Sequence, residues 1–441
     1  MKYKLALCIP TFNRPIVIKD FLERCAYNYI SVGIDIYVFD SSDNDDTKTV
    51  IDEWNQKNSC FINYIHMSSD IHPNIKVFKI YESFGKNDLY DFIWLSGDAI
   101  QYSHEGIKII TSSIDEKYDI IDVYYKDCEK IGKKEYSDYN DFLMECGWEL
   151  TLFGASILNT STMLKNINWQ DVIKKFCKES IVNFSHISFY FYQILQIKNF
   201  CALRIPVNSC EFKSSFYKKE SGWINNTFEI FCVSWLKTIE ELPSVYDPSK
   251  AIAVKKHGRY VMLRNVHDFY LLKKRNIYNF KVFMKYRKQL TKVSDVPLYK
   301  LALVAITPLK LLKTFLYLGK ESSEKKLQKL FDFCQSHDNL YIYGAGKVGF
   351  DIATLLLENN QNFKAFCVTN SSDNLTSMLG YPICCIQNLC ETQKSDAYFI
   401  ISIGKSKLNN IFDTLNQYGI NSDHIFYDSE LIQRLLTGEI K

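Results

Sequence analysis

The stretch KLALCIPTFNRP, residues 4–15, joins an apolar run to a polar turn and a proline. Leu5 to Ile9 has the composition of a buried strand. The next segment, PIVIKDFLERCAYNY, has the apolar spacing of a helix, with Pro15 in its first turn. Strand, polar turn and helix in this order predict the opening unit of an α/β domain.

The same alternation continues to about residue 125. Strands are predicted at residues 34–40, 60–67, 91–96 and 118–126, and helices at residues 45–57, 74–84 and 105–116. This rhythm predicts an open, mostly parallel sheet covered by helices. Ligands of such sheets bind at the carboxyl ends of the strands.

Polar side chains follow three of these strands. Thr11 and Asn13 follow the first strand, Asp40 ends the second, and Asp98 follows the strand that ends at Ser96-Gly97. A single aspartate after a strand can be an ordinary turn residue. Three strand ends with such groups favour a common ligand site instead.

These motifs also carry a family resemblance. The strings CIPTFNRP, VFDSSDNDDT and WLSGDA, in this order and spacing, resemble family 2 glycosyltransferases of the GT-A fold over about residues 1–230. The resemblance implies a nucleotide-sugar donor, usually a UDP-sugar, whose diphosphate is bridged by Mg²⁺ or Mn²⁺. It assigns the following roles. Asp98 with Gly97 would form the metal motif, Asp40 would contact the base, and Pro10, Thr11 and Asn13 would shape the pocket.

Three features of this resemblance stay open. Lys76 stands where the family often has a basic residue near the nucleotide, but it can equally be a solvated helix lysine. The metal motif has one carboxylate, Asp98, where the family commonly has two. No acid pair follows the acceptor-loop segment FGASILNTSTM, so His186, Glu149 and Glu179 are the candidate bases that activate an acceptor hydroxyl.

The charge of the chain is unevenly distributed. The net charge is only +3, but residues 255–319 hold 15 Lys and Arg against two acids. Lysines interrupt the apolar segment 296–320, which disfavours a transmembrane span and favours an interfacial helix pair at an anionic membrane surface. A solvated basic face over a helical core is the alternative. Nucleic acid ranks low because no nucleic-acid-binding motif is present.

A second glycine loop lies near the C-terminus. YIYGAGKVG, residues 341–349, places Gly344, Gly346 and Gly349 between a predicted strand and a predicted helix. Residues 338–430 resemble the small Rossmann-like sugar-nucleotide-binding domain found beside bacterial acetyltransferases and glycan-assembly enzymes. The second strand ends in Thr369-Asn370, where an NAD site would have an acid for the ribose.

The sequence therefore predicts an α/β chain in three parts: a GT-A domain at residues 1–230, a basic helical connector at 231–335 and a Rossmann-like domain at 336–441. The expected activity is an inverting transfer of a hexosyl or N-acetylhexosaminyl group to a lipid-linked glycan in bacterial capsule, exopolysaccharide or lipopolysaccharide synthesis. The fourteen cysteines show no metal-ligand spacing, and a reducing cytoplasm, at the inner face of the membrane, is the expected location. A homo-oligomer, an NAD(P)- or sugar-nucleotide-dependent epimerase or oxidoreductase, and a non-catalytic sugar-nucleotide-binding protein stay open.

Overall fold

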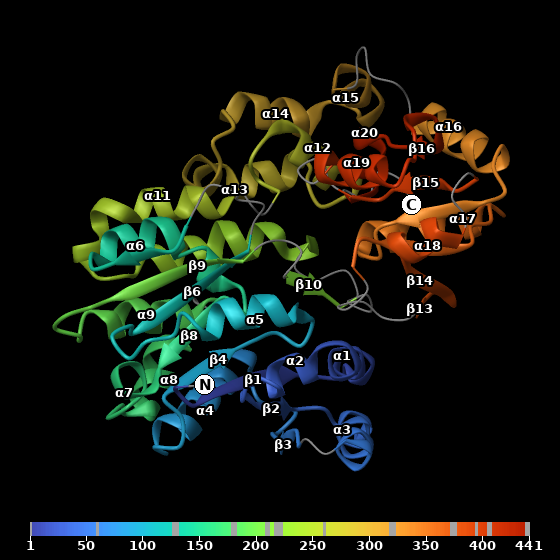
Figure 1. Cartoon of the computed structure of the whole chain (residues 1–441). Helices are drawn as coiled ribbons and strands as arrows, with labels where there is room; N and C mark the ends of the chain where they lie inside the picture. Colours follow the sequence, from blue (N-terminus) through green and yellow to red (C-terminus); the bar gives the residue numbers. More distant parts are fainter. Residues whose placement is uncertain are drawn as a thin grey trace. The chain divides into compact units, whose positions relative to one another are not determined.

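The chain divides into two compact units, Met1–Leu309 and Lys310–Lys441. The computed structural model describes residues 2–58, 61–125, 132–177, 183–207, 212–215, 224–258, 262–316, 323–370, 377–392, 396–403 and 408–436. Each unit is a separate α/β body with its own sheet. Figure 1 shows the elements of both, coloured along the sequence.

The first unit is built on an eight-stranded sheet of order β3-β2-β1-β4-β8-β6-β9-β7. The strands are β1 (Leu5–Thr11), β2 (Asp35–Asp40), β3 (Asn63–His66), β4 (Phe92–Leu95), β6 (Ile120–Tyr125), β7 (Lys134–Tyr136), β8 (Ser156–Asn159) and β9 (Ala202–Val207). Strands β3, β2, β1 and β4 are parallel, whereas β8 runs antiparallel to both of its neighbours. Strands β5 (Ile100–Tyr102) and β10 (Phe212–Ser214) form a separate antiparallel ribbon, in which β5 follows the loop after β4.

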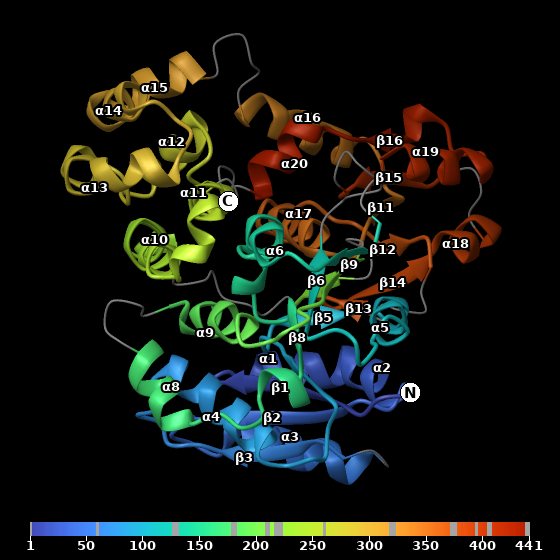
Figure 2. The ribbon, with the colours of Figure 1, turned by 90° about the vertical axis from the view of Figure 1, so that its left-hand side faces the viewer.

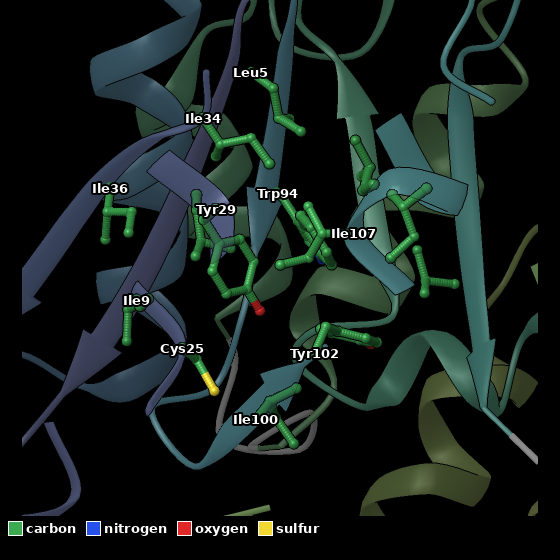
Figure 3. Close-up of a cluster of buried hydrophobic side chains, with 14 of the residues drawn as sticks. Leu5, Ile9, Cys25, Tyr29, Ile34, Ile36, Trp94, Ile100, Tyr102 and Ile107 are labelled. Carbon is green, nitrogen blue, oxygen red and sulfur yellow. The ribbon is translucent and has the colours of Figure 1, made fainter. Parts of the chain in front are cut away.

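Helices cover both faces of this sheet. One face carries α1 (Pro15–Phe21), α2 (Tyr27–Ile30), α3 (Asp46–Lys57) and α5 (His104–Thr111), and the other carries α4 (Pro73–Gly85), α8 (Trp169–Phe176) and α9 (Ser185–Ile194). A π-helical turn, Leu22–Ala26, joins α1 to α2. Figure 3 shows the apolar core under α1, α2 and α5, where the ring of Tyr29 lies beside that of Trp94 of β4. Alternate strand residues supply this core because side chains of a strand point to opposite faces.

The rest of the first unit is helical. Its helices are α6 (Tyr139–Cys146), α7 (Thr160–Met163), α10 (Leu236–Glu240), α11 (Asp247–Gly258), α12 (Val266–Lys274), α13 (Phe280–Val293) and α14 (Leu298–Ile306). Helix α11 packs on α6 and α13, and α14 packs on α12 and α13. Figure 2 shows α10 to α14 in colours from yellow-green to gold. Lys273 of α12 donates hydrogen bonds to the carbonyls of Val304 and Ala305 at the end of α14. Among the helices of the described ranges, none is long and apolar enough to span a bilayer.

The second unit contains a six-stranded sheet of order β13-β14-β12-β11-β15-β16. Its strands are β11 (Leu340–Tyr343), β12 (Ala365–Val368), β13 (Ser377–Met378), β14 (Tyr381–Cys385), β15 (Tyr398–Ile401) and β16 (Ile425–Phe426). Its helices are α15 (Leu309–Leu316, which begins at the boundary), α16 (Ser323–Gln335), α17 (Lys347–Glu358), α18 (Ile386–Thr392), α19 (Leu408–Gln417) and α20 (Ser429–Leu436). All pairs except β13–β14 are parallel. Strands β12 and β15 lie on opposite sides of β11, so the glycine loop between β11 and α17 lies where the strand order reverses.

The structure confirms the predicted fold class, an α/β chain with a large N-terminal sheet, a basic helical region and a second C-terminal sheet. The first sheet is mostly parallel as expected, with β8 inserted antiparallel between β4 and β6. Residues 148–163 hold a 3-10 turn at Glu149–Thr151, then strand β8 and helix α7.

Candidate functional site at the edge of the first sheet

The predicted polar groups meet at one edge of the first sheet. Thr11 is the last residue of β1 and pairs in register with Asp40, the last residue of β2. Asp98 follows β4, which pairs with β1 on its other side. The hydroxyl of Thr11 donates a hydrogen bond of 3.0 Å to Asp98 Oδ2, so the two loops touch.

The loop after β1 turns back at Asn13. Asn13 has φ of +51°, the left-handed conformation that asparagine tolerates better than most residues. Its backbone N–H donates to Ser42 Oγ at 2.8 Å, and Ser42 Oγ donates to Asp40 Oδ1 at 2.5 Å. Asp40 also accepts from the Ser42 N–H at 3.0 Å and from the Tyr64 hydroxyl at 3.1 Å. Asp40 is fully buried, so in this conformation its carboxylate organises the loops after β1 and β2.

Lys76 of helix α4 is hydrogen-bonded to both of these loops. Its ammonium donates to the carbonyl of Thr11 at 2.6 Å and to Ser41 Oγ at 2.8 Å. The side chain is buried rather than solvated, contrary to the alternative left open by the sequence. Burial lowers the pKa of Lys76 to about 8, and the charges of Asp40 and Asp98 oppose that shift. A buried ammonium at the ends of two strands is a positive charge aimed at the sheet edge.

Asp98 is held by a cation of the chain itself. Arg14 donates from NH1 to Asp98 Oδ1 at 2.5 Å, and Thr11 occupies the other oxygen. The Asp98 side chain is only 6% exposed, whereas that of Arg14 is 36% exposed. Gly97 lies in the tight turn before it, where its carbonyl accepts from the Ile100 N–H at 2.9 Å.

This arrangement does not fit a divalent metal ion on Asp98. A hard cation needs several oxygen ligands, and it would compete with the guanidinium for the same carboxylate oxygen. Within the described ranges no group of three or more His, Cys, Asp or Glu side chains is placed to hold a metal. Asp40 offers no second carboxylate, since its oxygens are bonded to Ser42 and Tyr64.

Two of the three candidate bases, His186 and Glu149, are buried. His186 is buried on α9, where its Nε2 lies 3.3 Å from the carbonyl oxygen of Leu150 and its ring packs against Phe153 at 5.3 Å. Burial lowers the pKa of His186 to about 4, so the imidazole is neutral at ordinary pH. Phe153 also lies beside Gly97, since a Cβ on Gly97 would be 3.7 Å from the Cβ of Phe153. Glu179 lies outside the described residues.

Glu149 belongs to a buried ionic cluster. Both of its carboxylate oxygens accept from NH2 of Arg204, at 2.5 and 2.6 Å. Asp122 of β6 lies 3.5 Å from Nε of the same arginine and is fully buried. Burial raises the pKa of Glu149 to about 10, and the charge of Asp122 adds to the shift. The role of base stays a prediction for Glu149 and His186, and in this conformation neither presents its basic atom to solvent.

Sequence reasoning missed Arg14 and Arg204. Arg14 was visible, because it stands in the same turn as Thr11 and Asn13, but its partner 84 residues away was not. Arg204 lies in the apolar strand ALRIPV, and a charged residue in a buried strand signals a buried counter-charge.

The glycine loop of the second unit has the expected backbone. Gly344 has φ of +116°, and a Cβ on Gly349 would lie 2.0 Å from the Gly344 carbonyl oxygen. A Cβ on Gly346, at the start of α17, would meet nothing within 4 Å. Thr369, at the position of the expected acid, shares a hydrogen bond of 2.7 Å with the Tyr343 hydroxyl. The loop can therefore turn tightly into its helix, but nothing at Thr369 offers a carboxylate to a ribose.

Comparison with known proteins gives only distant likenesses. No family model and no curated protein sequence matches the chain. Among solved structures, the mannosyltransferase PcManGT from Pyrobaculum calidifontis, in complex with GDP-Man and Mn²⁺, is similar over 69% of this chain and 86% of its own, with 11% identity and a TM-score of 0.39. S. aureus TarS 1–349 in complex with UDP-GlcNAc is similar over 65% of this chain and 81% of its own, with 12% identity and a TM-score of 0.38. These values are too low to transfer an activity to this chain.

Proposed function

We propose that the chain is a glycosyltransferase that binds a nucleotide-sugar donor at the β1–β2–β4 edge of its first sheet. The observation that carries the proposal is the buried ammonium of Lys76, which is bonded to the ends of β1 and β2. The edge also holds the half-exposed guanidinium of Arg14. The donor class itself comes from the resemblance of residues 1–230 to family 2 glycosyltransferases.

The chemistry of this edge suits a diphosphate. The leaving group of sugar transfer is a nucleoside diphosphate, whose growing negative charge must be stabilised in the transition state. Lys76 and Arg14 supply positive charge, and arginine is suited to phosphate by its planar fork of donors. Asp40 and Ser42 hold the two loops in place, so these cations are oriented before a donor arrives.

A thermal-shift and calorimetric screen with UDP-sugars and GDP-sugars tests the donor site. A matching donor should raise the melting temperature of the first unit by mass action. Lys76→Met should weaken binding about tenfold or more, because it removes a buried charge at the phosphate position. Lys79→Met is the matched control, since Lys79 lies on the same helix but is paired with Glu82 at the surface. Failure of every donor to bind would reject the proposal.

Turnover distinguishes an enzyme from a binding protein. Release of free nucleotide from the bound donor, with water or a glycan acceptor, is expected of a transferase. A chain that binds the donor tightly but releases no nucleotide with any lipid-linked acceptor would be a binding protein instead.

We further propose that the acceptor is lipid-linked and that α13 and α14 contact the anionic inner face of the membrane, in bacterial surface glycan synthesis. Large apolar side chains are exposed on these two helices: Phe280, Met284, Tyr299, Leu303 and Ile306. Exposed lysines accompany them: Lys281, Lys285, Lys288 and Lys300. Apolar side chains beside lysines are the composition of helices that lie in the lipid interface.

Vesicle co-sedimentation tests this surface. The full chain should bind phosphatidylglycerol vesicles and should bind phosphatidylcholine vesicles much less. Replacement of Leu303 and Ile306 by serine should reduce the bound fraction several-fold, because burial of each side chain contributes about 2 kcal/mol. Phe61→Ser, an exposed apolar residue before β3, is the control. Equal binding by the double variant and the wild type would reject the surface.

A further inference from the structure

We propose that Arg14 supplies the positive charge that binds the donor diphosphate, and that Asp98 positions this guanidinium instead of holding a divalent cation. The inference rests on the proposed function. It names the group that replaces a metal at this edge.

The geometry of the ion pair supports a positioning role for Asp98. Its carboxylate is nearly buried and is fixed by Thr11 on one oxygen and by Arg14 on the other. Arg14 is the more exposed partner, so the pair presents its cationic member to solvent. A guanidinium has five N–H donors, and the 2.5 Å bond to Asp98 uses one of them. The remaining donors suit a bidentate contact with phosphate oxygens.

The local backbone aims Arg14 at the edge. Asn13 reverses the chain in its left-handed conformation, and Pro15 begins α1 directly afterwards. Arg14 is thus confined between a turn and a helix start. The Asn13 N–H is tied to Ser42, so the turn is also anchored to the loop after β2.

The exposed charge of this edge is a cation. Arg14 and Lys76 balance the carboxylates of Asp98 and Asp40, and both carboxylates are buried whereas the Arg14 side chain is 36% exposed. A divalent ion at Asp98 would have to displace the guanidinium from the same carboxylate oxygen. A diphosphate can reach the guanidinium without breaking that ion pair.

Calorimetric titration of the full chain with UDP, in excess EDTA and in excess Mn²⁺, tests the inference. We expect equal affinity in the two conditions. Arg14→Gln should weaken UDP binding about tenfold or more in both, as the loss of a charge-assisted phosphate contact predicts. Lys19→Gln is the matched control, because Lys19 lies on helix α1, which begins directly after Arg14, is exposed, and carries the same charge. Its affinity for UDP should be unchanged.

Two further variants separate the roles of the pair. Arg14→Lys keeps the charge but loses the fork, so it should recover part of the affinity. Asp98→Asn should weaken UDP binding equally with and without Mn²⁺, because the amide positions the guanidinium less firmly. UDP binding that requires Mn²⁺, or wild-type affinity in Arg14→Gln, would overturn the inference while leaving a donor site in place. Absence of UDP and GDP binding in both conditions would reject the donor site itself, and the inference with it.

Discussion

Replacement of Arg204 by methionine should be the most damaging single change in the first unit. Arg204 of β9 forms ion pairs with two buried acids, Asp122 and Glu149. All three side chains are at least 95% buried. Methionine has a similar length and no charge, so the change removes the cation while leaving most of the packing.

The protonation state of the cluster sets the size of the effect. Burial raises the pKa of Glu149 to about 10, and it also raises that of Asp122, although Arg204 opposes both shifts. Two acids share one arginine in this cluster, and the raised pKa of Glu149 places a proton on its carboxyl group at neutral pH. Removal of Arg204 leaves the buried acids without their cation, which costs about 3–5 kcal/mol.

Glu149→Gln is the informative comparison. It replaces a protonated carboxyl group by an amide of nearly the same shape and leaves Arg204 paired with Asp122. At pH 4.5, where Glu149 is protonated in the unfolded chain as well, we expect a loss of about 1 kcal/mol or less, the net size of one altered hydrogen bond. Above that pH the amide needs no proton to fold, so the variant gains stability relative to the wild type. The two variants differ in whether a buried charge loses its partner.

The cluster also predicts a pH dependence. The folded pKa of Glu149 lies above its ordinary value of 4.5, so its contribution to stability is complete below pH 4.5 and is lost as the pH rises through about 10. Between these two pH values the folded chain holds one proton more than the unfolded chain, so the free energy of unfolding falls by about 1.4 kcal/mol per pH unit. Glu149→Gln should flatten this slope between about pH 6.5 and 8.

Urea unfolding followed by tryptophan fluorescence measures these changes. All six tryptophans lie in the first unit, so the signal reports that unit in the full chain. A loss of less than about 1 kcal/mol in the unfolding free energy of Arg204→Met would refute the reasoning, because an unpaired buried charge destabilises a fold by more than that. An equal loss in Glu149→Gln would refute the assigned proton.

Other contacts lead to smaller tests. Gly349→Ala should destabilise the second unit by about 1–3 kcal/mol, because its Cβ would overlap the Gly344 carbonyl, whereas Gly346→Ala should change little; calorimetry of the second unfolding transition separates them. Thr11→Val should cost about 1–2 kcal/mol by removing the hydroxyl donor to Asp98, as measured by tryptophan fluorescence. His186→Phe should remove a loss of stability on acidification: the pKa of His186 is about 4 against an ordinary 6.5, so its contribution is complete above pH 6.5 and lost as the pH falls through 4.

Much of the fold was predictable because local patterns encode it. Apolar runs of four to seven residues became β1, β2, β4 and β11, and amphipathic spacing marked α3, α4 and α17. Polar residues at the ends of parallel strands predicted one shared edge, and Thr11, Asp40 and Asp98 do lie there. Each of these inferences needs only neighbouring residues and the geometry of a parallel sheet.

The amino-acid sequence by itself determined where strands and helices form and which strand ends are polar, since burial and backbone geometry act over a few residues. Only the tertiary structure decided the partners. Strand β8 lies between β4 and β6 although it follows both in the chain, and Arg14 meets Asp98 across 84 residues. The sequence around a charged residue in a buried segment indicates that the residue needs a partner. Which residue becomes the partner depends on the distant segments that pack against it. That packing pairs Asp98, the expected metal ligand, with Arg14 in this structure.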